Sequence, residues 1–281
     1  MSTLQGRVLH ELYQQASTPY EWHKQIFDKA RELGMDAFSS PFDDDAVDFL
    51  ESLDVPCYKV ASFECTCIPL LKKIASTGKP VIMSTGMASL GEIEEAVTTL
   101  RECGVKDLCL MKCTSAYPCP PEEMNLNTIP HLSQTFNLPV GISDHTLEPC
   151  VSVAGVALGA CLIEKHLTLS RAVDGPDAAF SSEPEDFKRM IHDCRTIEAA
   201  LGTVKYAGNG PAESKQRGLR RSLFVAEDMK KGDTFNKENL RNIRPGAGIH
   251  TRHYEEVLGQ KASQDIVRGT PMSFKLVATE E

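Results

Sequence analysis

Short apolar runs, each ended by polar residues and followed by a segment of helical periodicity, repeat along residues 1–205. Amphipathic segments lie between and after these runs, at residues 44–53, 89–104 and 183–202. This alternation of strands and helices predicts a parallel sheet. Because the runs are continuously apolar, as strands buried on both faces are, the pattern is typical of a (β/α) barrel. The six runs begin near Ala37, Cys57, Pro80, Leu108, Pro139 and Cys161.

The start of the pattern departs from a complete barrel. Residues 18–34 predict an opening helix, and the six strands that follow are two fewer than the eight of a closed barrel. We therefore expect a (β/α)8 TIM-type barrel lacking its first two strands, at residues 1–205. An open six-stranded doubly wound sheet is the alternative that fits the same alternation.

The composition changes after Lys205. Residues 206–218 are rich in Gly, Pro and polar residues, which predicts a linker. The segments "RSLFVA", "KASQDIV" and "SFKLV" then alternate with turn signals such as "KKGD" and "RPGAG". We expect a small β-rich domain at residues 219–281.

Charge and cysteine content restrict the classes of partner and compartment. The 39 acidic and 30 basic residues give a net charge of −9, which argues against nucleic acid and membrane surfaces as partners. Neither a signal-peptide pattern nor a membrane-length apolar run is evident, so a cytoplasmic protein is expected. The ten cysteines form no C-x-x-C pair, and we expect reduced thiols.

Polar residues end all six predicted strands, and in a barrel these ends converge on one pocket. Serines, threonines and lysines dominate the set, without a Gly-rich phosphate loop, so we expect a compact phosphate or carboxylate held by side chains. The set comprises Ser39, Ser40, Lys59, Ser62, Glu64, Ser84, Thr85, Lys112, Thr114, Ser115, Tyr117, Ser143, Asp144, His145, Glu164 and His166.

Two kinds of residue in this set, the histidines and Glu64, suggest chemistry beyond anion binding. His145 and His166 end neighbouring strands and lie at the spacing of a metal site, although each imidazole alternatively caps its strand and bonds a carboxylate. Glu64 suits acid–base work, or a salt bridge to Lys59. Cys113 has no obvious base nearby in the sequence and is interpreted as a core residue.

Motifs spread over almost the whole chain resemble the sialic acid synthase family. They are "SSPFD", "YKVASFE", "MSTGMAS", "KCTSAYPCPPEEMNL", "ISDHT", "EKHLTLSR", "GPDAAFS" and "NIRPGAG", in this order. The wording of "YKVASFE" and "GPDAAFS" is most similar to the pseudaminic acid synthases of that family. The resemblance implies a (β/α)8 barrel followed by an antifreeze-like SAF domain, a domain-swapped homodimer, and Mn²⁺ or Mg²⁺ bound by His145 and His166.

The resemblance also implies a reaction and roles for single residues. Phosphoenolpyruvate would condense with a 2,4-diacetamido-2,4,6-trideoxyhexose to give pseudaminic acid and phosphate. Glu64 matches a carboxylate that handles protons, and Tyr117 and Asp177 match sugar contacts. Arg244 matches an arginine that reaches the partner subunit's sugar. The residues that match the phosphoenolpyruvate site are Ser40, Lys59, Ser62, Ser84, Ser115 and Ser143, with Lys59 and Glu64 in the catalytic roles.

The chain departs from the family at its start. The family's first two strands carry A-E-[IM]-x-x-N-H and K-x-Q signatures, and neither occurs here. Two alternative functions therefore stay open: an N-acetylneuraminate synthase using N-acetylmannosamine, or a truncated, catalytically silent remnant that binds sugar and anion.

Overall fold

The computed structural model describes residues 16–173, 175–206 and 210–279. The chain forms two compact units, Met1–Gly202 and Thr203–Glu281, and each is described by itself.

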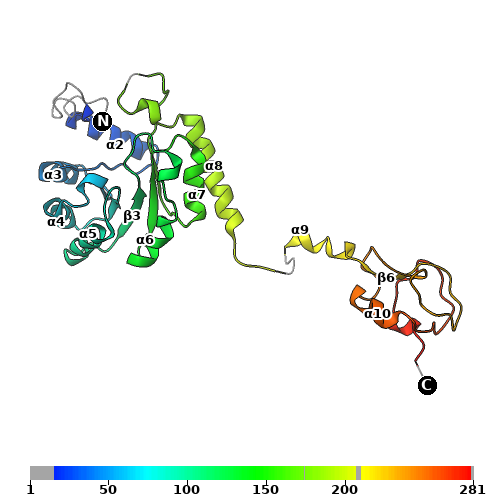
Figure 1. The fold of residues 1–281 in the computed structure, drawn as a ribbon. Coiled ribbons are helices and arrows are strands. Elements are labelled where there is room, and N and C mark those ends of the chain that lie inside the picture. The colour runs from blue at the N-terminus through cyan, green and yellow to red at the C-terminus, as the bar shows by residue number, and fades with distance from the viewer. Residues whose placement is uncertain (1–15, 174, 207–209, 280–281) are drawn as a thin grey trace. The chain divides into compact units, whose positions relative to one another are not determined.

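In the described part of the first unit, five parallel strands form one sheet whose spatial order follows the chain. A doubly wound sheet reverses its strand order part-way, and this sheet does not, so the doubly wound alternative is wrong. The predicted barrel-type winding is confirmed (Figure 1). The strands are β1 (Tyr58–Val60), β2 (Val81–Ser84), β3 (Leu108–Cys113), β4 (Val140–Asp144) and β5 (Ile163–Lys165).

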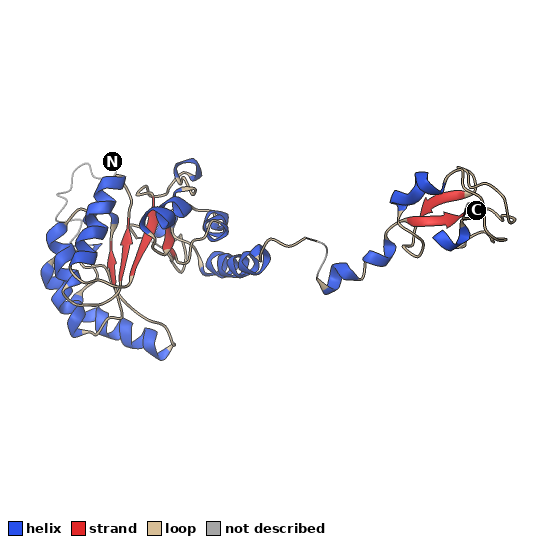
Figure 2. Cartoon of the chain, turned by 90° about the horizontal axis from the view of Figure 1, so that it is seen from below, coloured by secondary structure: helices blue, strands red, loops and turns tan. Residues whose placement is uncertain are grey.

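Seven α-helices of the described first unit wrap around this sheet (Figure 2). Asp43 caps α3 by accepting a hydrogen bond from the backbone of Ala46, and Ser89 with Glu92 forms a capping box on α5. None of the described helices is long and apolar enough to cross a membrane. The helices are α2 (Tyr20–Glu32), α3 (Asp44–Ser52), α4 (Ile68–Ala75), α5 (Leu90–Glu102), α6 (Thr128–Phe136), α7 (Pro149–Ala157) and α8 (Pro184–Leu201).

The first of the six predicted strands is wrong. Residues 35–41 adopt no regular secondary structure, and the sheet begins at β1. The prediction assumed a run buried on both faces, whereas Phe38 is 39% exposed and Phe42 is 66% exposed. The other five apolar runs and the opening helix are confirmed.

The core of the first unit lies between the sheet and its helices. Leu71, Met83, Leu110 and Ile142 each have no exposed surface. Gly141 of β4 is required by close packing, because a Cβ there would lie 2.5 Å from Met111 Sδ and 2.6 Å from the Leu162 carbonyl oxygen. The inner face of the sheet therefore has no room for a side chain at this position.

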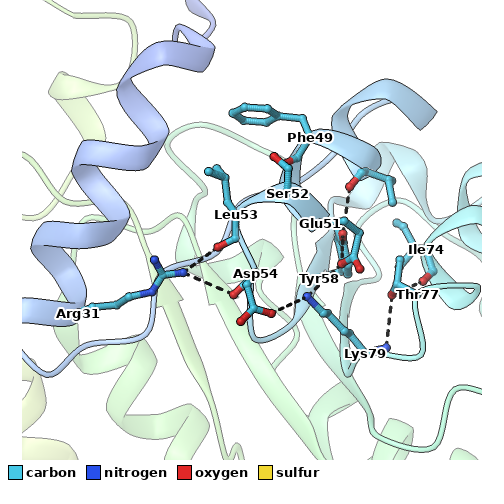
Figure 3. A network of polar contacts seen from close by, with 11 residues as sticks. Arg31, Phe49, Glu51, Ser52, Leu53, Asp54, Tyr58, Ile74, Thr77 and Lys79 are labelled. Atoms are coloured by element: carbon cyan, nitrogen blue, oxygen red, sulfur yellow. Dashed lines mark hydrogen bonds and ion pairs between the residues drawn. The ribbon is translucent and has the colours of Figure 1, made fainter.

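A polar network ties the amino ends of the strands to the helices that precede them (Figure 3). The Tyr58 hydroxyl donates to Glu51 Oε1 at 2.8 Å. Lys79 Nζ lies 3.1 Å from Glu51 and 3.4 Å from Asp54, and Arg31 donates to the Leu53 carbonyl at 2.8 Å. These contacts fix the end of the sheet opposite the strand ends that carry the predicted site.

The second unit has a small β core of its own. Strands β6 (Ser222–Val225) and β7 (Leu240–Ile243) pair antiparallel, and α9 (Pro211–Ser214) and α10 (Tyr254–Val257) are single turns. The prediction of strands in "KASQDIV" and "SFKLV" is wrong, because neither segment forms a regular strand. They form isolated bridges such as Met229–Ile266 and Ala262–Val277, because the chain turns too often for a continuous ladder.

Candidate active site

The first and last strands of the sheet meet through their side chains. Lys59 Nζ of β1 donates to Ser84 Oγ at 2.8 Å and lies 3.4 Å from Glu164 Oε2 of β5. Glu164 Oε1 accepts from Ser143 Oγ at 2.9 Å. In a flat sheet, strands four positions apart are separated by about 19 Å. The contact between Lys59 and Glu164 therefore requires a curled sheet, whose concave face holds the site.

A tight cradle lies beside Lys59, at the ends of β1, β2 and β3. Ser62 Oγ accepts a hydrogen bond from the Gly86 backbone at 3.1 Å. A Cβ on Gly86 would collide with Ser115 Oγ and lie 2.7 Å from Ser62 Oγ. Glycine at position 86 thus leaves room for the Ser62 and Ser115 hydroxyls, and its N–H holds the Ser62 hydroxyl in place. Sequence reasoning identified the two serines but not Gly86.

Cys113 lies at the centre of these hydroxyls. Burial opposes ionisation of its thiol, but hydrogen bonds with His145, Ser62 and Ser143 outweigh burial and lower its pKa to about 7. Burial lowers the pKa of His145. The contacts with Cys113 and the Thr114 carbonyl outweigh burial, so that the pKa of His145 is raised overall. Cys113 is 5% exposed, as a core residue would be, yet its neighbours are site residues.

The two predicted metal ligands face one another. The ring centroids of His145 and His166 are 5.4 Å apart, with the planes at 70°. His145 Nδ1 lies 2.9 Å from the Thr114 carbonyl, which can only accept, so Nδ1 carries the hydrogen and Nε2 keeps its lone pair for the Cys113 thiol or a metal. His166 Nδ1 lies 3.5 Å from Asp177 Oδ2, and burial lowers the pKa of this imidazole.

This donor set fits a divalent metal held by two imidazoles, with the other positions left to substrate and water. Both rings have one nitrogen fixed by a neighbouring oxygen, as metal-binding histidines do. Within the described residues, no group of three His, Cys, Asp or Glu side chains has metal-binding geometry. The alternative of an imidazole that bonds a carboxylate describes His166 but not His145.

An aromatic wall borders the histidines. The Tyr117 ring centroid lies 4.2 Å from that of His145 and 5.5 Å from that of Phe180. Burial raises the pKa of Tyr117 to about 12, so its hydroxyl remains a donor at neutral pH. Tyr117 is 48% exposed and thus faces both the site and solvent.

Glu64 is the least satisfied polar group of the site. Its Oε2 is buried and has no hydrogen-bond partner in the described part of the chain. Burial raises its pKa, and the charge of Lys59 offsets part of that shift. The alternative of a salt bridge between these two residues is wrong, because Lys59 pairs with Glu164 instead.

A buried ion pair supports the histidine-bearing ends of β4 and β5. Lys165 Nζ lies 3.0 Å from Asp144 Oδ2, and both side chains are almost fully buried. Asp144 also accepts from Ser152 Oγ and from the backbone and hydroxyl of Thr146. Because side chains alternate along a strand, this pair lies on the face opposite to Ser143 and Glu164.

Two predicted site residues belong neither to the strands of this sheet nor to the loops that follow them. Ser40 is half-buried in the irregular segment before α3 and makes no hydrogen bond within the described residues. Arg244 is exposed in the second unit, after β7. The predicted residues that do gather in the first unit are Lys59, Ser62, Glu64, Ser84, Ser115, Tyr117, Ser143, His145, His166 and Asp177.

Known proteins resemble the chain over nearly its whole length. The NeuB family matches residues 2–206, and the SAF domain matches residues 220–278. A pseudaminic acid synthase of Helicobacter pylori is 42% identical over 94% of this chain and 78% of its own length. One from Campylobacter jejuni is 43% identical over 94% of this chain and 76% of its own length.

A solved structure agrees with these sequence matches. The spore coat polysaccharide biosynthesis protein SpsE of Bacillus subtilis superposes with a TM-score of 0.65 at 31% identity. The superposition covers 99% of this chain and 83% of that protein. The resemblance of the sequence motifs is thereby confirmed. The chain belongs to the NeuB family, with an SAF domain in its second unit.

Proposed function

We propose that the protein is a nonulosonic acid synthase that condenses phosphoenolpyruvate with a 2,4-diacetamido-2,4,6-trideoxyhexose, giving pseudaminic acid and phosphate. The observation that carries this proposal is a buried lysine and a serine cradle together with Glu64, whose buried Oε2 has no hydrogen-bond partner among the described residues. The names of the Helicobacter and Campylobacter relatives support the choice of sugar acid.

The anionic groups of phosphoenolpyruvate are expected to bind along two arms of the site. Lys59 with Ser84 and Ser143 forms one arm, and the hydroxyls of Ser62 and Ser115 form the other, with Ser62 held by the Gly86 N–H. The bound anion competes with Glu164 for the Lys59 ammonium. Lysine and hydroxyls bind an oxyanion as a point charge with surrounding donors.

The reaction requires one carbon–carbon bond and one carbon–oxygen cleavage. The enol carbon attacks the aldehyde carbon, water adds at C2 of the former enolpyruvate, and phosphate leaves with the bridging oxygen. The water loses a proton and the aldehyde oxygen gains one. Glu64, with its raised pKa and free Oε2, suits this transfer.

His145 and His166 are the proposed ligands of Mn²⁺ or Mg²⁺. When bound, the metal supplies Lewis-acid polarisation of the aldehyde and a template for the two substrates. The chain's own part is to orient the two rings through the Thr114 carbonyl and Asp177.

The sugar is expected to lie against Tyr117 and Asp177, with an additional contact from Arg244. We include in the proposal a domain-swapped homodimer in which the SAF domain of one subunit offers Arg244 to the site of its partner. A guanidinium suits an acetamido oxygen, and a Gly- and Pro-rich stretch at residues 206–218 precedes the SAF match in the sequence.

Calorimetry with phosphoenolpyruvate tests the anion site. Lys59→Met should weaken binding by roughly tenfold or more, because a hydrogen bond to a charged group contributes about 1.5–3 kcal/mol. Lys79→Met is the matched control, since Lys79 lies at the opposite end of the sheet. Equal affinity in the wild type and Lys59→Met would show that the lysine is structural. Mn²⁺ titration of His145→Ala/His166→Ala tests the metal ligands, and unchanged affinity would exclude them.

A further inference from the structure

A second hollow, of about 550 Å³, opens at the end of β3, next to the cradle. Lys112 of β3, Thr85 after β2, Asn125 before α6 and Thr128 at its start contribute to its lining. Cys113 faces the serine cluster, and successive side chains of a strand point to opposite faces. Lys112 therefore leaves β3 on the face away from that cluster, and the hollow shares only Cys113 and Ser115 with the anion site already described.

The charge of Lys112 is not balanced within the described residues. Lys59 and Lys165, whose side chains are also buried, pair with Glu164 and Asp144. Lys112 is 7% exposed and forms no ion pair in the part of the chain that the structure describes. Buried ammonium groups are normally paired, because burial without a counter-charge costs several kcal/mol.

Two of the three N–H groups of the Lys112 ammonium form hydrogen bonds within the protein. Its Nζ donates to the Cys113 carbonyl and to Thr114 Oγ1, each at 2.8 Å. An ammonium carries three N–H groups, so the third remains for a ligand. Burial lowers the pKa of this ammonium, with only the Cys113 and Cys119 thiols opposing the shift, and no carboxylate contributes to it.

The rest of the lining combines polar residues, among them Asn125, Thr128 and the acidic Glu123, with four apolar ones. The Asn125 side chain donates one amide hydrogen to the Glu123 carbonyl at 2.9 Å, and its second hydrogen and its oxygen have no partner among the residues that the structure describes. Thr128 adds a hydroxyl at the start of α6. The volume exceeds that of a single ion and falls within the range of small-molecule pockets.

We propose that this hollow is a second binding site, which holds a small hydroxylated oxyanion with its phosphate or carboxylate group on Lys112 and its hydroxyls against Asn125 and Thr128. Such a ligand provides the counter-charge that the described residues do not. Neither Lys59 nor Glu64 lines the hollow, and Ser115 is the one residue of the phosphoenolpyruvate cradle that does.

Calorimetry on the full chain in a Lys59→Met background tests the site, because the first anion site is then weakened. The probes are inorganic phosphate and, in separate titrations, gluconate. We expect at least one probe to bind, and the added Lys112→Met substitution to weaken it by about tenfold or more. The control adds Lys79→Met, in place of Lys112→Met, to the Lys59→Met background. It should leave the affinity for the probe unchanged. Binding of phosphate alone assigns a phosphate ligand, and binding of gluconate alone assigns a carboxylate.

Two results would overturn the proposal: binding of neither probe, or affinities that Lys112→Met does not change. Circular dichroism verifies that each variant is folded. If Lys112→Met does not fold, Asn125→Ala/Thr128→Ala replaces it. This variant should bind the probe severalfold more weakly, and an unchanged affinity would overturn the proposal. Turnover of phosphoenolpyruvate is measured separately, on the wild-type chain. Lys112-dependent binding without turnover would contradict the proposed function only.

Discussion

Removing Lys165 should destabilise the first unit more than removing any exposed lysine. The Asp144 carboxylate has no exposed surface and lies 3.0 Å from Lys165 Nζ, which also donates to the Thr146 carbonyl at 2.6 Å. Lys165→Met keeps the apolar stem but leaves a buried carboxylate with hydrogen bonds and no cation. Breaking one side of a buried pair costs roughly 3–5 kcal/mol.

The assay is urea unfolding followed by the fluorescence of Trp22, the one tryptophan of the chain, together with far-UV circular dichroism. Trp22 lies on α2, so its signal reports the first unit. With a urea dependence of about 1–3 kcal/mol per molar, the midpoint should fall by about 1 M or more. Lys79→Met should change it little, because Lys79 forms only partly exposed pairs.

A double variant separates the pair from its surroundings. Asp144→Asn/Lys165→Met removes both charges, so that no unpaired charge stays buried. It should therefore lower the free energy of unfolding by less than the sum of the two single substitutions. A midpoint within about 0.3 M of the wild type for Lys165→Met, or strict additivity in the double variant, would refute the reasoning.

Three further predictions concern the site. Gly86→Ala should raise the KM for phosphoenolpyruvate with little change in unfolding, because the added Cβ occupies the space between Ser62 and Ser115; an unchanged KM would contradict the cradle. Burial raises the pKa of Glu64 above its ordinary value of 4.5, so ionisation costs folding free energy as the pH rises through the folded-state pKa. Glu64→Gln should therefore stabilise the first unit at neutral pH and not below about pH 4, while abolishing turnover; equal gains at both pH values would count against this. Inactive Glu64→Ala and Arg244→Ala variants should recover partial activity after subunit exchange, and no recovery despite exchange would exclude a contact across subunits.

The local pattern was sufficient for most of the fold. Strands such as β2 and β3 and the helices between them follow from continuous apolar runs and amphipathic segments. The segment at Ala37 fails because its aromatic residues are exposed, which the pattern does not reveal. In the second unit, frequent turns leave single bridges where strands were predicted.

The site was predictable where a residue's role depends on its position at a strand end. Lys59, Ser143, His145 and His166 were found in this way. The pairing of Lys59 with Glu164 was not, because it depends on the curl that brings β1 to β5. The environment of Cys113 and the need for Gly86 likewise arise from side chains of other strands.

The central claim is that the cradle and Glu64 drive condensation with carbon–oxygen cleavage. The most direct measurement supplies phosphoenolpyruvate labelled with heavy oxygen at the bridging position, together with the diacetamido sugar and Mn²⁺. The account predicts equal amounts of nonulosonic acid and phosphate, all of the label in phosphate, and far slower formation of both products by Lys59→Met at limiting phosphoenolpyruvate. Label retained in the nonulosonic acid, or phosphoenolpyruvate left unconsumed by the wild-type chain, would contradict it.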